Sequence, residues 1–551
     1  MKNKLSGIYE FNNRLKPLKM KIAYIFLILS TLLASISATN LPIDDVCIAG
    51  GGPAGMALGV ALKDHGYTFK IFELRPQCGG NCDTLYFTGP DNQQHFVEMG
   101  VAAYINTALV GSFGLGNWSI DAKAFVERFL GPNSTIPFSS GTSAPQLFLN
   151  LENGQYVVPS FDPIAFQNAL VGWLTLLTVN YQWADIGRYT GPITSEMLLP
   201  FDQMATQYGL DPLATLIDFF GFISGFASGN YSDLPSLYML TGMSRAAIVS
   251  LVTGGPDGAF KIKDGCQGLY NSIATYLGSQ NVVTSATITS AKRHKNNRPI
   301  KVKGFVNGTP FKYKCRNLVI AYPPTLDNLM YMNPDHLETS VLSGLKTQNY
   351  YTGAYTFEGP YTESSGFGIF GADAGSRFYA PFTTSITGLG RDLPFGPASV
   401  QVYSPDYKPI EQIRTIVQTQ INNIPSNLIN QSTVYVPTFQ HRNYSAQFTF
   451  SALSSAVSPY AKWDDLQGHL KTFYVGSTGA MVPSSSHAWN EAYYFANTYF
   501  PNKNTRRSEQ FNDRLEKSNN VFSAAEIHDL ARKVTDKMSE YVQTRRSLVR
   551  S

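Results

Sequence analysis

Glycines are concentrated in one short stretch near the start of the chain, Gly50-Gly51-Gly52-Pro53-Ala54-Gly55. The first glycine permits a tight turn, the third lets the backbone approach a pyrophosphate, and the last lets the next helix pack against the preceding strand. N–H groups at the start of that helix favour negative charge. The pattern predicts a loop that binds the pyrophosphate of a dinucleotide, with these candidate residues: Gly50, Gly52, Pro53, Ala54 and Gly55.

An acidic residue follows the glycine stretch at the distance expected of a ribose-binding carboxylate. Glu73 lies 23 residues after Gly50, where a carboxylate can bind the ribose hydroxyls of an adenosine. Its charge disfavours a 2′-phosphate, so FAD or NAD fits and NADP does not. The alternative is a glycine-rich loop followed by an unrelated surface acid, which would need no surrounding strand–helix–strand unit.

Three elements must position these residues. Asp45–Ala49 is a short apolar run with two β-branched residues, typical of a buried parallel strand. A helix is predicted over Met56–Lys63, and a second strand over Thr68–Phe72 carries Glu73 at its C-terminal end. Together they predict a Rossmann-type βαβ unit.

The residues after Glu73 distinguish FAD from NAD. Arg75, Gly79-Gly80-Asn81 and Thr84 form a second glycine-containing turn. Here the chain resembles the flavin-dependent amine oxidase superfamily, whose motif reads Glu-x-Arg, three residues, Gly-Gly-Arg, two residues, Ser/Thr. The resemblance implies FAD as the cofactor. Asn81 stands where the superfamily has an arginine that helps to bind the pyrophosphate, so one charged contact is missing.

Four further segments carry the same resemblance. Phe96–Gly100 looks like the strand that returns beside the flavin, and Asn317–Pro324 like the strand that leads into the substrate domain. Val282–Ala291 is similar to the strand whose backbone meets the adenine, with Ile288 as the expected contact. Thr472–Gly479, followed by a predicted helix over Trp489–Phe500, resembles the closing motif, in which a helix N-terminus faces the flavin.

The resemblance therefore implies additional cofactor contacts and some departures. Ser477 stands where the superfamily has a glutamate that binds the ribityl chain, and the superfamily's substrate-side lysine and caging aromatics have no assigned counterpart. The covalent link that monoamine oxidases make between the flavin and a cysteine near the C-terminus has no counterpart, because no cysteine follows Cys315. Noncovalent FAD is therefore expected, unless a histidine such as His95 or His487 is bonded to the flavin. A divergent branch similar to β-cyclopiazonate dehydrogenase fits these departures. The cofactor contacts implied here are Glu73, Arg75, Gly79, Gly80, Asn81, Thr84, Gly100, Ile288, Gly476, Ser477 and Trp489.

The fold class expected is α/β, with a Rossmann-type FAD-binding domain interleaved with an α+β substrate domain, as in the two-domain amine oxidases. The predicted segments are a signal peptide (1–38), FAD-binding parts (39–105, 261–325 and 466–501), a helical substrate part (106–260), a β-rich substrate part (326–465) and a basic helical tail (502–551). In the tail, Ser523-x-x-Glu526 predicts a capping box. It opens an apolar stripe that either packs on the body of the protein or docks elsewhere.

The N-terminal segment predicts passage through the secretory route. Lysines precede the apolar run Ile22–Leu33, and small residues follow it, as in a signal peptide; an uncleaved anchor is the alternative, although the run is short for a membrane span. We expect a secreted or vesicular protein with no stable membrane span after signal removal. Glycans are expected at six Asn-x-Ser/Thr sites: Asn117, Asn133, Asn230, Asn307, Asn430 and Asn443.

Five cysteines are too few for a disulfide scaffold. Cys47 is expected as a free, buried thiol in its strand, and Cys78 and Cys82 could pair in an oxidising compartment. The spacing of cysteines and histidines shows no metal site. The Lys and Arg excess lies at the two ends of the chain, so no nucleic-acid surface is expected.

The function expected from the resemblance is FAD-dependent oxidation of a C–H bond in a small amine-bearing or apolar molecule. A hydride passes to flavin N5, and O2 or another electron acceptor reoxidises the cofactor. Aromatic clusters at 348–351 and 378–382 are candidates for covering the flavin, with ordinary packing as the alternative. Two further alternatives are a desaturase-like or prenylcysteine-oxidase-like enzyme and a flavin-binding protein that has lost catalysis.

Overall fold

A computed structural model describes most of the chain between residues 42 and 550. The described residues are 42–106, 120–137, 146–157, 161–214, 234–253, 258–294, 296, 298–358, 368–371, 383–387, 396–404, 406–503 and 522–550. The predicted signal peptide, the glycosylation sites Asn117 and Asn230 and the aromatic cluster at 378–382 lie outside these residues.

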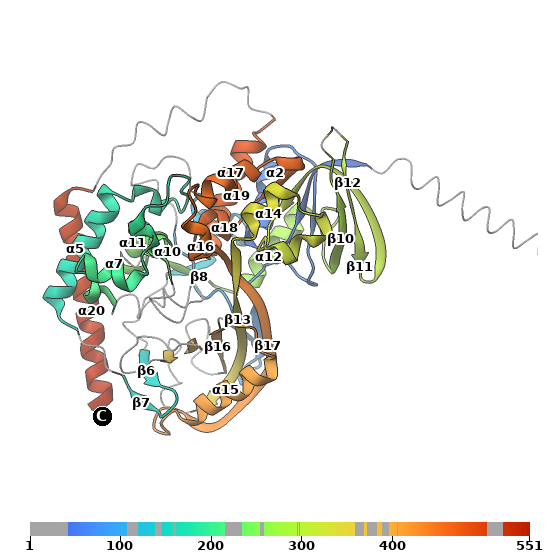
Figure 1. Ribbon diagram of the computed structural model, residues 1–551. Coiled ribbons are helices and arrows are strands. Elements are labelled where there is room, and N and C mark those ends of the chain that lie inside the picture. Colours follow the sequence, from blue (N-terminus) through green and yellow to red (C-terminus); the bar gives the residue numbers. More distant parts are fainter. Residues whose placement is uncertain are drawn as a thin grey trace, which may run out of the picture.

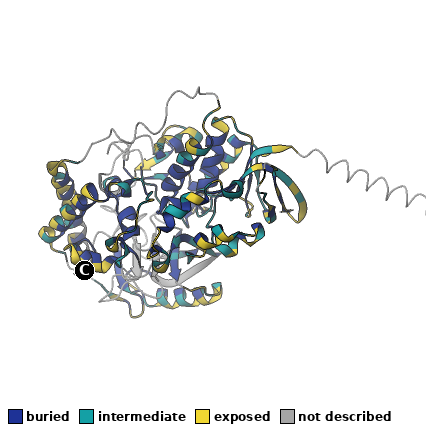
Figure 2. Cartoon of the chain, turned by 45° about the horizontal axis from the view of Figure 1, so that its top comes forward, coloured by how far each residue is buried: buried dark blue, intermediate teal, exposed yellow. Residues whose placement is uncertain are grey.

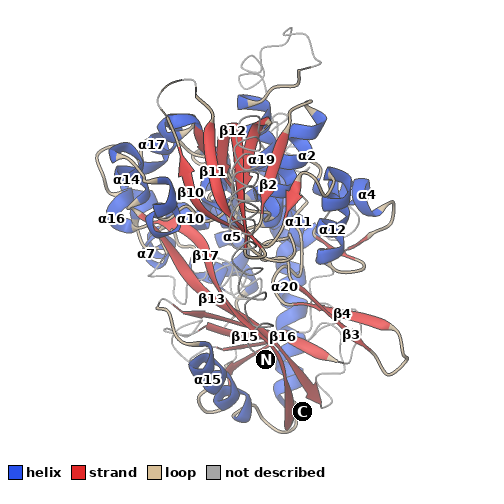
Figure 3. Cartoon of the chain, turned by 90° about the vertical axis from the view of Figure 1, so that its right-hand side faces the viewer, coloured by secondary structure: helices blue, strands red, loops and turns tan. Residues whose placement is uncertain are grey.

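One sheet contains the predicted βαβ unit and gathers strands from three distant parts of the chain (Figures 1 and 3). Its centre is parallel, with β1 between β12 and β2, and β18 also pairs with β12. The sheet extends to the right in Figure 1, where β10, β11 and β12 pair in antiparallel order. The strands, in order across the sheet, are β10 (Ala286–Lys292), β11 (Ile300–Val306), β12 (Thr309–Ile320), β1 (Ile43–Ala49), β2 (Phe69–Phe72) and β9 (Val282–Val283), with β18 (Thr472–Tyr474) beside β12.

Alternation along β1 produces two apolar layers, because successive side chains of a strand point to opposite faces. Val46 and Ile48 join a core cluster with the helices on one face, whereas Cys47 and Ala49 join the large cluster on the other. Helices on the first face are α2 (Pro53–Asp64), α12 (Cys266–Leu277), α19 (Ser485–Tyr499) and, beside α12, α4 (Ala122–Leu130). The second face contacts residues of α14 (His336–Leu342) and α17 (Pro459–Leu466).

A second sheet, largely antiparallel, lies below the first in Figures 1 and 3. Its long strands β13 and β17 rise from it toward the first sheet, and α15 (Ile410–Asn422) packs on its outer face through Ile413, Val417 and Ile421. Its order is β17 (Asn430–Phe448), β13 (Leu345–Glu358), β16 (Pro397–Ser404), β15 (Thr383–Thr387), β14 (Gly368–Gly371), β6 (Gln146–Asn150) and β7 (Gln155–Tyr156).

A helical layer flanks both sheets, and Figure 2 shows exposed residues gathered on its outward sides. It contains α5 (Pro163–Val179), α6 (Ser195–Leu198), α7 (Phe201–Gln207), α10 (Ser236–Gly242), α11 (Arg245–Thr253) and α20 (Ala524–Arg550). The predicted capping box of α20 is confirmed, because Glu526 N–H donates to Ser523 Oγ and Ser523 N–H to Glu526 Oε2. The apolar stripe packs back on α5 (Figure 1) through Ile527, Leu530, Val534 and Met538.

The remaining elements are short. They are the hairpin β3 (Thr84–Thr88) and β4 (Gln94–Glu98), the pair β5 (Thr135–Pro137) and β8 (Phe260–Ile262), and the helices α13 (Leu326–Leu329), α16 (Phe450–Leu453) and α18 (Ser477–Ala480). Among the helices that the structure describes, none has both the length and the apolar sequence needed to cross a bilayer.

Two predicted elements differ from the structure in ways that affect the site. The strand expected over Val282–Ala291 is interrupted between β9 and β10, where Ser285 has φ of +51° and leaves the extended conformation. The closing helix begins at Ser485 rather than at Trp489. The serines at 485 and 486 suit a loop by propensity, but tertiary packing buries both of them within the first turn.

Cys47 is buried in its strand as expected, but the expected free state of its thiol is wrong, and the possible pairing of Cys78 with Cys82 does not occur. Cys47 is disulfide-bonded to Cys315, and their Cα atoms are 5.7 Å apart. Cys82 pairs with Cys266 at a Cα separation of 5.9 Å, which leaves Cys78 free and buried. The paired cysteines are 268 and 184 residues apart, so no short spacing in the sequence indicates the pairing. The pairing of β1 with β12 in the sheet and the packing of β3 near α12 bring these cysteines together.

Candidate cofactor and substrate site

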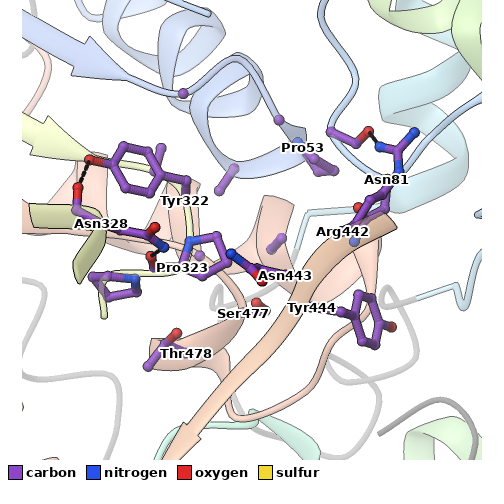
Figure 4. Close-up of a pocket in the computed structure, with 18 of the residues that line it drawn as sticks. Pro53, Asn81, Tyr322, Pro323, Asn328, Arg442, Asn443, Tyr444, Ser477 and Thr478 are labelled. Atoms are coloured by element: carbon purple, nitrogen blue, oxygen red, sulfur yellow. Dashed lines mark hydrogen bonds between the residues drawn. The ribbon is translucent and has the colours of Figure 1, made fainter. Parts of the chain in front are cut away.

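A cavity of about 560 Å³ lies between the two sheets, within the usual range for ligand pockets. Figure 4 shows Asn81 and Arg442 at one side of it and Tyr322 and Asn328 at the other. Its walls come from the glycine loop after β1, the ends of β2, β10 and β12, the turn at Gly80, the strands β13, β16 and β17, and the segment after β18.

The glycine loop is shaped by close backbone approaches. Gly50 has φ of +108°, a conformation that L side chains rarely adopt. A Cβ on Gly55 would lie 2.0 Å from Gly50 O, so only glycine allows α2 to start this close to the loop. Gly52 is the N-cap of α2 and supplies no side-chain hydrogen bond to the first turn, and Pro53 occupies its first position. The N-terminal N–H groups of α2 therefore face the cavity without a side-chain cap, which is the arrangement that binds anions.

Glu73 joins this loop to the end of β2. Its carboxylate accepts hydrogen bonds from Gly51 N–H (2.6 Å) and Arg75 N–H (2.8 Å). The side chain is 9% exposed and lines the cavity. Because a carboxylate has more than two acceptor positions, Glu73 retains capacity for ligand hydroxyls. These features fit the adenosine and diphosphate of a dinucleotide.

The turn after Glu73 lies against the glycine loop. A Cβ on Gly80 would approach Pro53 Cδ to 2.8 Å, and a Cβ on Gly100 would approach Asn81 O to 1.8 Å. The side chains of Arg75 and Arg442 both donate to the carbonyl oxygen of Gly80. This turn therefore connects three walls of the cavity.

The structure brings twelve of the sixteen predicted cofactor contacts to the cavity wall: Gly50, Gly52, Pro53, Ala54, Glu73, Arg75, Gly80, Asn81, Gly100, Ile288, Gly476 and Ser477. Gly55 and Gly79 lie behind it in the backbone turns. Thr84 is also behind the wall, where its hydroxyl donates to Glu98 (2.9 Å) and accepts from Gln267 N–H (3.0 Å).

Trp489 does not line the cavity, which corrects the prediction for this residue. It is fully buried, stacks on Tyr104 at 5.2 Å and donates to Tyr270 Oη at 3.3 Å. Ala488, the preceding residue of α19, lines the cavity instead, and Trp489 packs into the core.

The closing segment presents two helix starts to the cavity. Gly476, with φ of +130°, is the N-cap of the single-turn helix α18, and Ser484 is the N-cap of α19. Neither residue supplies a side-chain cap. Ser477, Thr478 and Ser485 line the same wall and add hydroxyl groups.

The far wall is formed by residues that the sequence did not single out individually. Tyr350, Tyr403 and Tyr444 come from three strands of the second sheet; Tyr350 stacks on Tyr403 at 4.9 Å and lies 5.2 Å from Tyr444. The hydroxyl of Tyr350 donates to Met99 O, and that of Tyr444 to Pro483 O. Tyr350 falls in the predicted cluster at 348–351, but no spacing pattern marks Tyr403, Tyr444 or Arg442, because they converge only through sheet pairing.

Glu98 is buried behind this wall and accepts a 2.5 Å hydrogen bond from Cys266 N–H at the start of α12. Burial raises the pKa of Glu98 to about 7, against the lowering effect of the hydrogen bonds from Cys266 and Thr84. Glu98 thus links the β3–β4 hairpin to α12, and this link depends on whether the carboxyl group of Glu98 is protonated.

The histidines considered for covalent attachment lie away from the described cavity wall. His95 contacts Asp91 at 2.8 Å on the β3–β4 hairpin. His487 is buried in α19, and burial lowers its pKa to about 4. The predicted glycosylation site Asn443 lines the cavity, so a glycan there would compete with any ligand, whereas Asn133 and Asn307 are exposed.

Comparisons with known proteins agree with this arrangement. Residues 48–108 match the NAD(P)-binding Rossmann-like domain. The chain is 35% identical to the uncharacterized protein R656 of Acanthamoeba polyphaga mimivirus, over 84% of this chain and 94% of that protein. It is 25% identical to the FAD-dependent oxidoreductase dbaF of Emericella nidulans, over 83% and 91% of the two chains. It is 24% identical to the β-cyclopiazonate dehydrogenase of Aspergillus oryzae, over 52% and 56%.

Solved structures share the fold. A fatty acid isomerase from P. acnes superposes with a TM-score of 0.64 at 19% identity, covering 83% of this chain and 99% of the isomerase. A putrescine oxidase variant superposes with a TM-score of 0.56 at 15% identity, covering 83% and 98%. The α/β architecture with a Rossmann-like domain and a second domain is thus confirmed.

Proposed function

We propose a reaction and a substrate class for this chain from the premise that it belongs to the flavin-dependent amine oxidase superfamily and is an FAD-dependent oxidoreductase. The proposed reaction is oxidation of a C–H bond in a small apolar or neutral amine-bearing molecule, with transfer of a hydride to flavin N5. The cofactor is proposed to be FAD held without a covalent bond, because the described walls contain no cysteine or histidine.

The distribution of charge along the cavity supports this substrate class. Three of its described wall residues carry a charge, Glu73, Arg75 and Arg442, and all three surround the glycine loop and the Gly80 turn. The remaining described wall is uncharged: it consists of aromatic, apolar and hydroxyl-bearing residues, among them Tyr322, Tyr331 and the tyrosines of the second sheet, and of the amides of Asn81, Asn328 and Asn443. A charged substrate would find no described counter-ion there, and burying an unpaired charge is costly.

The residues present fit FAD. The uncapped start of α2 and the glycine loop would hold the diphosphate, Glu73 would hold the adenosine ribose, and the backbone of β10 near Ile288 would contact the adenine. The starts of α18 and α19 would direct positive dipole ends at the ring system. FAD itself supplies the electron-accepting ring. The tyrosine wall excludes water and orients the substrate.

The two disulfides support a secretory or other oxidising compartment, because disulfides persist poorly in the cytosol. We therefore propose a secreted or vesicular enzyme that uses O2 or another acceptor. Exposure of Asn133 and Asn307 leaves these two sites accessible for glycosylation.

The test is spectroscopic. Purified protein should show flavin absorption bands, and denaturation should release free FAD into the filtrate. Anaerobic addition of neutral amines, prenylated thioethers or indoles should bleach the bands with one class, and air should restore them with release of H2O2.

Three results would contradict the proposal. A colourless protein that binds no added FAD would exclude the cofactor, and flavin that stays with the denatured chain would exclude noncovalent binding. Flavin bands that no substrate bleaches would favour a binding protein. Because one structural neighbour is an isomerase, products are also analysed for rearrangement without net oxidation.

A further inference from the structure

Arg442 reaches from the second sheet to the glycine-rich turn of the first. It lies on β17 directly opposite Tyr350 of β13, and its side chain is 10% exposed. Its Nη1 donates to Gly80 O at 2.6 Å, and its Nη2 contacts the carboxylate of Asp83. Figure 4 shows the guanidinium beside Asn81. A buried cation from the substrate-side sheet thus lies within the predicted cofactor turn.

The guanidinium has donor capacity that the described protein atoms do not use. Arg442 Nε is buried and has no hydrogen-bond partner among them. A buried donor without a partner is costly, about 1–3 kcal/mol, so such groups in native proteins call for an explanation. A ligand acceptor in the adjoining cavity is one such explanation.

A second cation converges on the same point. The carbonyl oxygen of Gly80 accepts from Arg75 as well as from Arg442. Burial lowers the pKa of Arg442, and the nearby charge of Arg75 lowers it further. Two guanidinium groups that share one carbonyl repel each other, and the carboxylates of Asp83 and Glu73 offset part of this repulsion. An anion between the guanidinium groups and the loop would offset more of it.

The turn that both arginines contact lies against the glycine loop. The closest approach involves Gly80 and Pro53, the first residue of α2, and a Cβ on Gly52 would lie 3.6 Å from Gly80 Cα. Arg442, the turn and the uncapped start of α2 therefore border one part of the cavity. Paired guanidinium groups next to a helix N-terminus match a doubly charged diphosphate in both charge and hydrogen-bond geometry.

We infer that Arg442 is a diphosphate-binding residue of the cofactor site and supplies, from the second sheet, the cation that is missing at Asn81. The inference rests on the proposed cofactor and deepens it. Since β17 also carries Asn443 and Tyr444 in the cavity wall, the same strand would contact the cofactor phosphates and the substrate side.

The competing role for Arg442 is structural, as the partner of Asp83 that fixes β17 to the β3–β4 hairpin. The two roles differ in what Asp83→Asn does. That variant breaks the same ion pair but leaves the cation, and it also removes an anion close to the diphosphate. A structural role predicts equal effects of Arg442→Gln and Asp83→Asn, whereas a diphosphate-binding role predicts that only Arg442→Gln weakens nucleotide binding.

The experiment measures dissociation constants of the full-length apoprotein for FAD, ADP and adenosine. With Arg442→Gln we expect about tenfold or greater weakening for FAD and ADP, the range of hydrogen bonds to charged groups, and no change for adenosine. Asp83→Asn should bind FAD and ADP at least as tightly as the wild type does, because it removes an anion close to the diphosphate. Asn81→Arg in the Arg442→Gln background should restore most of the lost affinity.

Several results would overturn the inference while leaving the proposed cofactor intact: unchanged FAD affinity in Arg442→Gln, an equal loss in Asp83→Asn, an equal loss for adenosine, or no rescue by Asn81→Arg. If Arg442→Gln fails to fold by circular dichroism, Arg442→Lys replaces it. The lysine keeps the charge next to Asp83 but lacks the Nε donor and the forked geometry, so several-fold weaker FAD binding is expected and unchanged binding contradicts the role. Failure of the wild type to bind FAD would instead reject the proposed function.

Discussion

The backbone N–H of Gly51 donates a hydrogen bond of 2.6 Å to the carboxylate of Glu73. The acid at the end of β2 therefore fixes the glycine loop, whereas the sequence predicted only that it would bind the same ligand as the loop. Glu73 thus holds the glycine loop in addition to its proposed role toward the ligand.

Replacement of Glu73 by glutamine is expected to weaken FAD binding about tenfold or more, because a charge-assisted hydrogen bond and a ribose acceptor are both lost. Flavin fluorescence during titration of the apoprotein measures the change. Glu411→Gln is the control, since Glu411 is 78% exposed on α15. Equal affinities of the Glu73 variant and the wild type would contradict the role.

Two helical glycines provide a matched pair. Gly55→Ala should shift the loop and abolish FAD binding, because the new Cβ would lie 2.0 Å from Gly50 O. Gly268→Ala, in α12, meets nothing within 4 Å and should raise the free energy of unfolding by about 0.5–1 kcal/mol through helix propensity. Urea denaturation measures the stability of both variants, and titration with FAD measures their affinity for the cofactor. Loss of FAD binding in the Gly268→Ala variant would contradict the explanation, because it would show that an added methyl group far from the glycine loop has the same effect.

The stability of the protein should depend on the protonation of Glu98. Because burial raises the pKa of this acid from 4.5 to about 7, the folded state binds a proton that the unfolded state releases, and stability falls as pH rises from about 4.5 to 7. The loss is about 3 kcal/mol, at about 1.4 kcal/mol for each pKa unit. Glu98→Gln should remove this slope and be the more stable protein at pH 8. Parallel pH profiles of the two proteins, measured by chemical denaturation, would rule out this contribution.

Thiol titration tests the disulfide assignment. Native protein should react with no thiol reagent at Cys78, because burial and the nearby Glu73 raise the pKa of this thiol to about 12 and only the thiolate reacts. Unfolding without reductant should expose one thiol, and unfolding with reductant all five cysteines. Cys78→Ala should remove the single thiol and keep both disulfides. A count of three or five without reductant would contradict one or both bridges.

The cavity wall that we propose for the cofactor was largely predictable from sequence. Backbone motifs such as Gly50–Gly55 and the acid at Glu73 are local in the chain, so their spacing alone indicates their use, and the cavity contains most of the predicted residues. Trp489 shows the limit: Ala488 lines the cavity, whereas Trp489, one residue and about 100° further round α19, stacks on Tyr104 in the core, so an error of one residue decides which side chain faces the ligand.

The substrate side was not predictable in the same way. Arg442 and Tyr403 reach the cavity through strand register in the second sheet, and a register cannot be read from one strand alone. The disulfide partner of Cys47 depends on which strand lies beside β1 in the sheet. The two cysteines are 268 residues apart, and a connection of this length does not determine which strand that is.

The position of β12 has a consequence for biosynthesis. This strand lies between β1, near the start of the described chain, and β18, near its end. During translation, β1, α2 and β2 emerge long before β12, so one edge of β1 stays without its partner strand until β12 has been made. The cavity closes only after the ribosome has passed Ala488, its last described wall residue. The complete cavity therefore exists only after the synthesis of nearly the whole chain, and we expect a nascent protein stalled before this point to hold no flavin.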